Sequence, residues 1–108
     1  MKDLFADYSG VPDENSGPAI TANNDAIAAA LADAVAGTGD GFYFDRPFYF
    51  SEPFTFPVEA DEPNRPLHFG IQGRSPSAWM MYTGDRANVA IDVSGAPFHE
   101  NVPGLVEK

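Results

Sequence analysis

The sequence contains no cysteine, few basic residues and no long apolar run. Without cysteine, a disulfide framework and a thiolate zinc site are both excluded, and the redox compartment stays open. Six Lys and Arg residues stand against sixteen Asp and Glu residues, which gives a formal net charge of −10. Proteins that bind nucleic acids or anionic membranes rely on clustered basic residues, so the composition argues against both kinds of partner.

No segment approaches the roughly 20 apolar residues that a membrane-spanning helix needs. The first seven residues also lack the apolar core of a secretory signal peptide. We therefore expect a protein that is made in the host cytoplasm, including one that is assembled into a particle before lysis. The acidic charge is expected to favour solubility.

The length of 108 residues predicts a single domain at most. Ten prolines and ten glycines favour turns and leave little room for long regular elements. We divide the chain into a polar N-terminal arm at 1–23, a capping helix with short strands at 24–95, and a tail or linker at 96–108 that leads to further or partner structure.

An alanine-rich stretch predicts a helix at about 24–36. Ile27, Leu31 and Val35 follow one another at a spacing of four and form a narrow apolar line that we expect to be buried. Such a helix would not be stable alone, so it is expected to lie over one end or side of a larger core.

Residues that favour helix ends lie on both sides of this stretch. Asn23 or Asn24 is the predicted N-cap, because a short polar side chain can accept a hydrogen bond from the first turn. Gly37 is expected at the C′ position, where a left-handed backbone ends many helices.

After the helix, aromatic residues alternate with polar ones, which is typical of short strands with one buried face. The predicted strands lie at 42–44, 48–51, 54–56, 67–71, 79–82 and 89–93. The side chains expected beneath or beside the helix are those of Phe44, Phe54, Phe69 and Ile91. The segment 58–66 is charged and rich in proline, and is expected to be a loop.

Several short motifs follow one another in a fixed order. They are Asp7-Tyr8-Ser9-Gly10-Val11, Ala26-Ile27-Ala28-Ala29-Ala30-Leu31, Gly41-Phe42-Tyr43-Phe44, Phe48-Tyr49-Phe50-Ser51, Phe54-Thr55-Phe56-Pro57, Phe69-Gly70-Ile71-Gln72-Gly73, Thr83-Gly84-Asp85 and Ala90-Ile91-Asp92-Val93. Their order resembles the N-terminal part of the pectate-lyase-like superfamily of right-handed parallel β-helices, which includes phage tailspikes and capsule depolymerases. The resemblance implies a mainly β fold: the start of a parallel β-helix with an N-terminal capping helix.

The resemblance covers about residues 7–95 and has two departures. The stretch 12–23 lacks the usual run of Gly and Asp before the helix. Members of the superfamily also continue for many further coils, and one or two coils are marginal alone. We therefore expect either a fragment of a longer protein or a chain whose open end is covered by another structure.

The sequence predicts no catalytic residue, no metal site and no cofactor. Asp45, Glu52, Asp85 and Asp92 lie in or beside the predicted strands, but no spacing brings a pair of them together as polysaccharide cleavage requires. In the superfamily that the chain resembles, the catalytic groups lie on later coils. We therefore expect no catalysis by this chain alone, although a full-length relative could be a polysaccharide depolymerase.

Other motifs that could bind a ligand are weak. His68 and His99 do not have the spacing of a metal-binding motif, and His68 is expected at the surface. The segment 13–17 lacks the alternating acids of a calcium loop, and 38–41 lacks the lysine of a phosphate loop.

Outward-facing aromatic side chains are the remaining candidates for binding. Tyr43, Tyr49, Trp79 and Tyr82 are candidate contacts for a glycan or for another subunit, whereas the alternative is ordinary packing in the core or between subunits. The positions of Trp79 and Tyr82 differ by an odd number, so in a regular strand at most one of the two side chains can face outward.

Three functions remain open from the sequence. The first is a structural or adhesion component of a virus particle, the base of a tail spike or fibre, with recognition of host-surface glycans by the particle. The second is the capping end of a polysaccharide lyase or hydrolase, and the third is a free-standing glycan-binding module. The resemblance implies a homotrimer that contacts other virion proteins, and open strand edges would favour such assembly.

Overall fold

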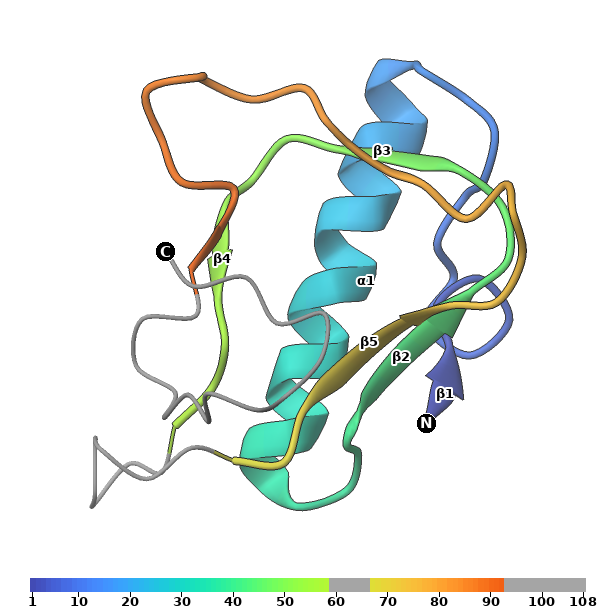
Figure 1. Cartoon of the computed structure of the whole chain (residues 1–108). Helices are drawn as coiled ribbons and strands as arrows, with labels where there is room; N and C mark the ends of the chain where they lie inside the picture. The colour runs from blue at the N-terminus through green and yellow to red at the C-terminus, as the bar shows by residue number, and fades with distance from the viewer. Residues whose placement is uncertain (59–66, 93–108) are drawn as a thin grey trace.

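The structure is a computed structural model, and it describes residues 1–58 and 67–92. These residues form one helix and several short strands (Figure 1). In chain order they are β1 (Lys2–Asp3), α1 (Gly17–Ala36), β2 (Gly41–Phe44), β3 (Phe48–Phe50), β4 (Phe54–Thr55), β5 (Gly70–Gly73), β6 (Met80–Tyr82) and β7 (Ile91–Asp92). The described domain is mixed α/β, with a longer helix and shorter strands than the mainly β prediction required.

All strand pairs are parallel and belong to three small sheets. The strand orders are β1-β2-β5, β3-β6 and β4-β7. The strands β2, β3 and β4 therefore pair one to one, and in the same order, with β5, β6 and β7. Figure 1 shows β2 and β5 side by side along the helix. The strands approach closely at Gly41, which has a φ of 121° and faces Gly70, so that an added Cβ would collide with the Gly70 carbonyl oxygen.

The helix α1 begins at Gly17, so the predicted start at residue 24 was wrong. Ser16 is the N-cap, and its Oγ accepts a hydrogen bond from the Ala19 N–H at 3.3 Å. Pro18 fits the first turn because its missing N–H would have no partner within the helix there. Gly37 ends the helix with a left-handed backbone at φ 80°, as predicted.

The buried face of α1 consists mainly of small side chains. Its buried residues are Ala19, Asn23, Ala26, Ile27, Ala30 and Ala34. Ile27 is buried as predicted and Leu31 is half-buried against the core, but Val35 is 62% exposed, so that prediction was wrong. The small alanine side chains allow the helix to lie close to the strands. The buried face is therefore centred on the alanines and not on the predicted line of Ile27, Leu31 and Val35.

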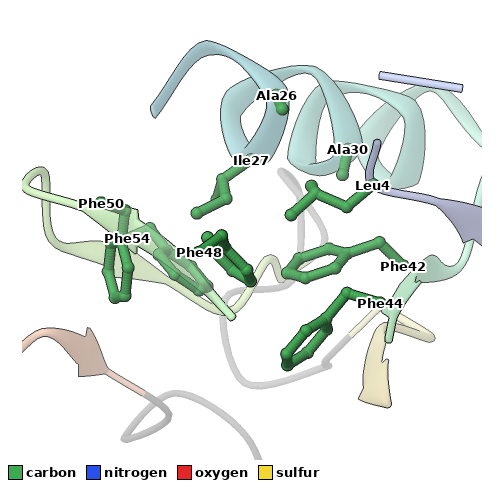
Figure 2. Close-up of a cluster of buried hydrophobic side chains, with 9 residues drawn as sticks. All are labelled: Leu4, Ala26, Ile27, Ala30, Phe42, Phe44, Phe48, Phe50 and Phe54. Carbon is green, nitrogen blue, oxygen red and sulfur yellow. The ribbon is translucent and has the colours of Figure 1, made fainter. Parts of the chain in front are cut away.

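Phenylalanines from three successive strands fill the core. Figure 2 shows Phe42, Phe44, Phe48, Phe50 and Phe54 beneath α1, with Ile27 and Leu4 pointing down onto them. Several of the rings meet edge to face, and the Phe44 and Phe48 centroids are 5.0 Å apart. The predicted burial of Phe44 and Phe54 is confirmed, whereas Phe69 and Ile91 are partly buried against the same core.

The later strands are placed slightly differently from the predictions. The predicted strand at 67–71 begins only at Gly70, because Leu67 to Phe69 are outside the ladder. Phe69 and Ile71 nevertheless pack on the core and His68 is exposed, as the alternation predicted. Most of the predicted loop at 58–66, the end of the strand at 89–93 and the tail at 96–108 lie outside the described residues.

Candidate functional site

Tyr43 lies on the outer face of β2, between the inward-facing Phe42 and Phe44. The guanidinium carbon of Arg74 lies 3.6 Å from the centroid of the Tyr43 ring, which is a close cation–π stack. The Arg74 Nε–H donates to Gln72 Oε1 at 2.8 Å, and Gln72 is the register partner of Tyr43 on β5. The three side chains therefore form one continuous polar and aromatic patch on this sheet.

Trp79 lies immediately before β6 and is 62% exposed. A tight turn holds it, because the Ala78 N–H donates to the Ser75 carbonyl and the indole N–H of Trp79 donates to the Pro76 carbonyl at 3.0 Å. Ser75 Oγ fastens this turn to the carbonyl of Asp45 at 2.6 Å. The only polar group of the indole is thus used within the chain, and its ring is available for stacking.

Of the other two candidate aromatics, Tyr82 contributes to the packing of the core. Tyr82 is half-buried, its ring lies 5.4 Å from that of Phe50, and its hydroxyl donates to the Asp85 carbonyl. Trp79 and Tyr82 therefore differ in orientation, as their odd separation predicted. Tyr49 is half-buried on β3, and its carbonyl accepts a hydrogen bond from Asn23.

The predicted carboxylates belong to different strands and connections of the fold. Asp45, Glu52 and Asp85 are exposed, and Asp85 Oδ1 accepts from the Ala87 N–H within a turn. Asp92 is half-buried on β7. Over residues 1–58 and 67–92, no group of three or more His, Asp or Glu side chains could hold a metal ion. His99 lies outside the described residues.

The segment 13–17, which lacks the pattern of a calcium loop, has a structural role. The Asp13 carboxylate forms an ion pair with Arg46 at 2.9 Å, and the Asp13 N–H donates to the Pro47 carbonyl. Asp13 adopts a left-handed backbone with φ 68°. These contacts hold the N-terminal segment against the connection between β2 and β3.

A polar cluster at the C-terminal end of α1 was not predicted. Asp33 Oδ2 accepts from the Tyr8 hydroxyl at 2.7 Å and from Lys2 Nζ at 3.2 Å, and Thr38 donates to Asp33 Oδ1. The hydrogen bond from Tyr8 and then that from Lys2 hold the pKa of Asp33 below its ordinary value. Burial, followed by the bond to Asp33, raises the pKa of Tyr8 to about 12. An acidic residue at the negative end of a helix dipole is unfavourable unless hydrogen-bond donors or cations lie beside it. The position of Asp33 in the last turn of the predicted helix was therefore the signal in the sequence for this cluster.

Two asparagines connect α1 to β3, and their role was also missed. Asn23 is fully buried; its side chain donates to the carbonyls of Val11 and Tyr49 and accepts from the Val11 N–H. Asn24 Oδ1 accepts from the N–H groups of Ser51 and Glu52. The prediction that one of them caps the helix was wrong, since both lie well inside it.

A shallow, open hollow of about 380 Å³ lies beside β4 and β7. It is lined by Pro53, Phe54, Thr55, Asn88, Val89 and Asp92. Asp92 is the only titratable residue among the described residues that line it.

No helix within the described residues is long and apolar enough to cross a bilayer. The chain matches no family model, no curated protein and no solved structure.

Proposed function

We propose that this chain is the capped N-terminal end of a right-handed parallel β-helix in a virus spike or fibre, with a structural and adhesive function. The observation that carries the proposal is the one-to-one parallel pairing of β2, β3 and β4 with β5, β6 and β7. Two successive coils of a β-helix would pair in this way, because each coil contributes one strand to each of the stacked sheets.

The contacts along one edge of β2 and β3 support the interpretation of a cap. This is the edge opposite to the one that pairs with β5 and β6. On β2, this side pairs with β1, and the Leu4 N–H donates to the Tyr43 carbonyl. On β3, the side chains of Asn23 and Asn24 bind the Tyr49 carbonyl and the Ser51 N–H. Strand and helix therefore satisfy the backbone groups that an uncapped edge would expose.

The opposite side of the stack is where assembly would take place. The Trp79 carbonyl accepts a hydrogen bond from the Phe48 N–H, and the Thr83 N–H donates to the Phe50 carbonyl. Because backbone groups alternate in direction along a strand, the N–H and carbonyl groups of Met80 and Tyr82 point away from β3. Within the described residues, no strand pairs with β5, β6 or β7 on this side. An edge of this kind favours pairing with further strands or another chain.

The resemblance to tailspikes supports a homotrimer in the virion that contacts other virion proteins. In this proposal, the assembled particle recognises glycans on the host surface. Asp45, Glu52 and Asp85 are exposed, and no described observation gives any of them a contact that would favour the lyase or hydrolase alternative.

Sedimentation equilibrium of the purified chain tests the assembly. We expect a trimer, and Met80→Lys should weaken the association because it places a charge at the open end of the core. Ser77→Lys adds the same charge on the exposed turn outside the strands and serves as the control. A stable monomer with a cooperative melt would contradict the proposal and favour a free-standing module.

Immunogold labelling tests the location. An antibody raised against the chain should decorate the spikes or fibres of the virus particle. Recovery of the chain only from the soluble fraction of infected cells would contradict a place in the virion.

A further inference from the structure

Trp79 presents a large apolar ring in a fixed position. It is 62% exposed, and its indole N–H donates to the Pro76 carbonyl at 3.0 Å. Ser75 fastens the turn, because its Oγ donates to the Asp45 carbonyl and accepts from the Ser77 N–H at 3.1 Å. Burial of this ring in a contact would therefore leave no indole N–H unpaired and would cost little conformational freedom. Rigid tryptophan side chains of this kind are common anchors of protein interfaces.

The hollow beside β4 and β7 offers a surface that such a ring could fill. Three of its lining residues are apolar: Pro53, Phe54 and Val89. Val89 is 67% exposed, and its volume of about 380 Å³ puts the hollow at the lower end of the range for ligand-binding pockets. Among the described residues after α1, Trp79 and Val89 are the two large apolar side chains that are exposed.

The charge of the chain restricts where two copies can meet. A net charge of −10 makes copies of the chain repel each other. The turn from Ser75 to Trp79 contains no charged residue, and Asp92 is the single charged residue in the described lining of the hollow. A contact between these two patches therefore brings few like charges together, which favours a second copy of the chain as the occupant of the hollow.

We propose that the Trp79 ring of one copy of this chain occupies the hollow of the next copy. The inference rests on the homotrimer proposed above for the number of copies, and it adds a lateral contact to the assembly at the open strand edge. The surface that gives the ring differs from the surface that receives it, so the contact is heterologous. Every copy gives one ring and receives one.

The positions of the two patches favour a closed ring of copies. The turn at 75–79 follows β5, and Ser75 binds it to the connection between β2 and β3. The hollow combines Pro53, from the connection between β3 and β4, with Asn88, from the connection between β6 and β7. Each patch therefore includes one connection from each set of strands, so the two patches lie at the same height along the stack, with β3 between them (Figure 1). A heterologous contact between patches of equal height has no rise along the stack and can close, whereas a contact with a rise would build an open filament.

The fluorescence of Trp79 tests the contact, because the chain has one tryptophan. The full chain is measured at increasing concentration by emission and by acrylamide quenching, with sedimentation equilibrium on the same samples. As the chain associates, we expect the emission to move to shorter wavelength and the quenching to fall. In sedimentation, Trp79→Ser and Val89→Asp should each weaken the association about tenfold or more, as expected for the anchor of an interface and its seat.

The matched control is Val35→Asp, which makes the same change as Val89→Asp at a side chain that is 62% exposed on α1, outside both patches. Its association should stay within about twofold of the parent, as is usual for a surface position. Circular dichroism of each variant shows whether the fold is intact.

A mixture of two variants tests whether giver and receiver are different surfaces. Trp79→Ser lacks the ring but keeps the hollow, whereas Val89→Asp keeps the ring but lacks an apolar seat for it. An equimolar mixture should therefore form one intact contact between unlike chains. The fluorescence of the mixture comes only from the Trp79 of the Val89→Asp chain, and we expect that ring to be shielded in the mixture but exposed in the Val89→Asp chain alone.

The outcomes separate this inference from the proposed function. A trimer whose Trp79 stays open to acrylamide would overturn the inference and leave the proposed assembly standing. Shielding of Trp79 in an assembly that is not a trimer would support the contact and contradict the proposed stoichiometry. A chain that stays monomeric at every concentration would overturn both. Equal losses in Val89→Asp and Val35→Asp would show general charge repulsion and would overturn the contact.

Discussion

At the residue scale, Asn23 is the polar side chain on which the packing of the N-terminal half depends. It lies fully buried, and one amide satisfies backbone groups of both Val11 and Tyr49. Buried polar groups are tolerated when all of them are paired, and this side chain pairs three backbone groups at once. It therefore joins the N-terminal segment, the helix α1 and the strand β3.

We predict that Asn23→Ala lowers the free energy of unfolding by about 3 kcal/mol or more, because two carbonyls and an N–H would lose their partner away from water. Urea denaturation measures this change. Asn15→Ala is the matched control: Asn15 is exposed and makes no hydrogen bond within the described residues, so the effect should be within about 0.5 kcal/mol. Equal effects in the two variants would show that the buried amide has no special role.

Tyr8 gives the fold a dependence on alkaline pH. Its pKa is raised from 10.0 to about 12, so the folded chain holds this proton more tightly than the unfolded chain does. The resulting stability is fully present below the unfolded pKa and is lost as the pH rises through the folded one. We predict that Tyr8→Phe reduces the fall in stability between about pH 10 and 12. Urea denaturation at a series of pH values checks this, and parallel curves for parent and variant would contradict it.

The sequence was informative about apolar residues and much less so about polar ones. Alternation placed Phe44 and Phe54 in the core, because a strand exposes its two faces in turn. The roles of Asn23 and Asp33 could not be obtained in this way. Their partners are backbone and side-chain groups far along the chain, and only the folded arrangement brings those groups opposite the helix.

At the element scale, the end of the helix α1 could be predicted from the sequence, whereas its start and its buried face could not. The end at Gly37 was predicted, since glycine readily adopts the left-handed backbone there. The predicted start at residue 24 leaves out Gly17 and Pro18, because glycine and proline generally favour turns, although proline is well suited to a first turn. The buried face was misplaced because the alanines that form it carry little weight in an apolar pattern.

The position of the buried face leads to a test with two neighbouring residues of the same predicted line. Leu31→Asp should cost several kcal/mol, because its side chain packs against the core and an unpaired carboxylate would be placed there. Val35→Asp introduces the same charge one turn later, where the side chain is 62% exposed. It should change stability by about 0.5 kcal/mol or less, as is usual for surface positions. Thermal melts of both variants check this, and similar losses would contradict the observed orientation of α1.

At the scale of the whole molecule, the described residues form one helix over three small parallel sheets. The predicted parallel strands are present in small sheets, whereas the number of coils and the particle to which they belong cannot be obtained from the periodicity of 108 residues. Periodicity gives the face of each strand, but the partners of an open edge depend on another part of a chain or on another molecule.

We predict that the purified chain does not cleave acidic polysaccharides. Incubation with a panel of them should give no new reducing ends and no absorbance from unsaturated sugars, with an active polysaccharide lyase as the positive control. The physical reason is that Asp45, Glu52 and Asp85 are exposed to water, and that residues 1–58 and 67–92 contain no group of three or more acids or histidines that could hold a metal ion to activate a base. Turnover that is abolished by changing one of Asp45, Glu52, Asp85 or Asp92 would refute the prediction.

The one-to-one pairing of the strands also has a consequence for the rate of folding. The hydrogen bonds that join the first three paired strands, β2 to β4, to the later ones, β5 to β7, connect residues that are distant in the sequence. Ser75 follows Asp45 by 30 positions, and Thr83 follows Phe50 by 33. The entropy of closing each loop is lost before the ladder can form, and topologies rich in such contacts fold slowly. The helix forms from neighbouring residues and needs no such closure. We therefore expect the alanine-rich helix to form transiently before the phenylalanine-rich strands β2, β3 and β4 have paired with β5, β6 and β7. Aggregation is most favoured in this interval, because the apolar side chains and strand edges are then exposed.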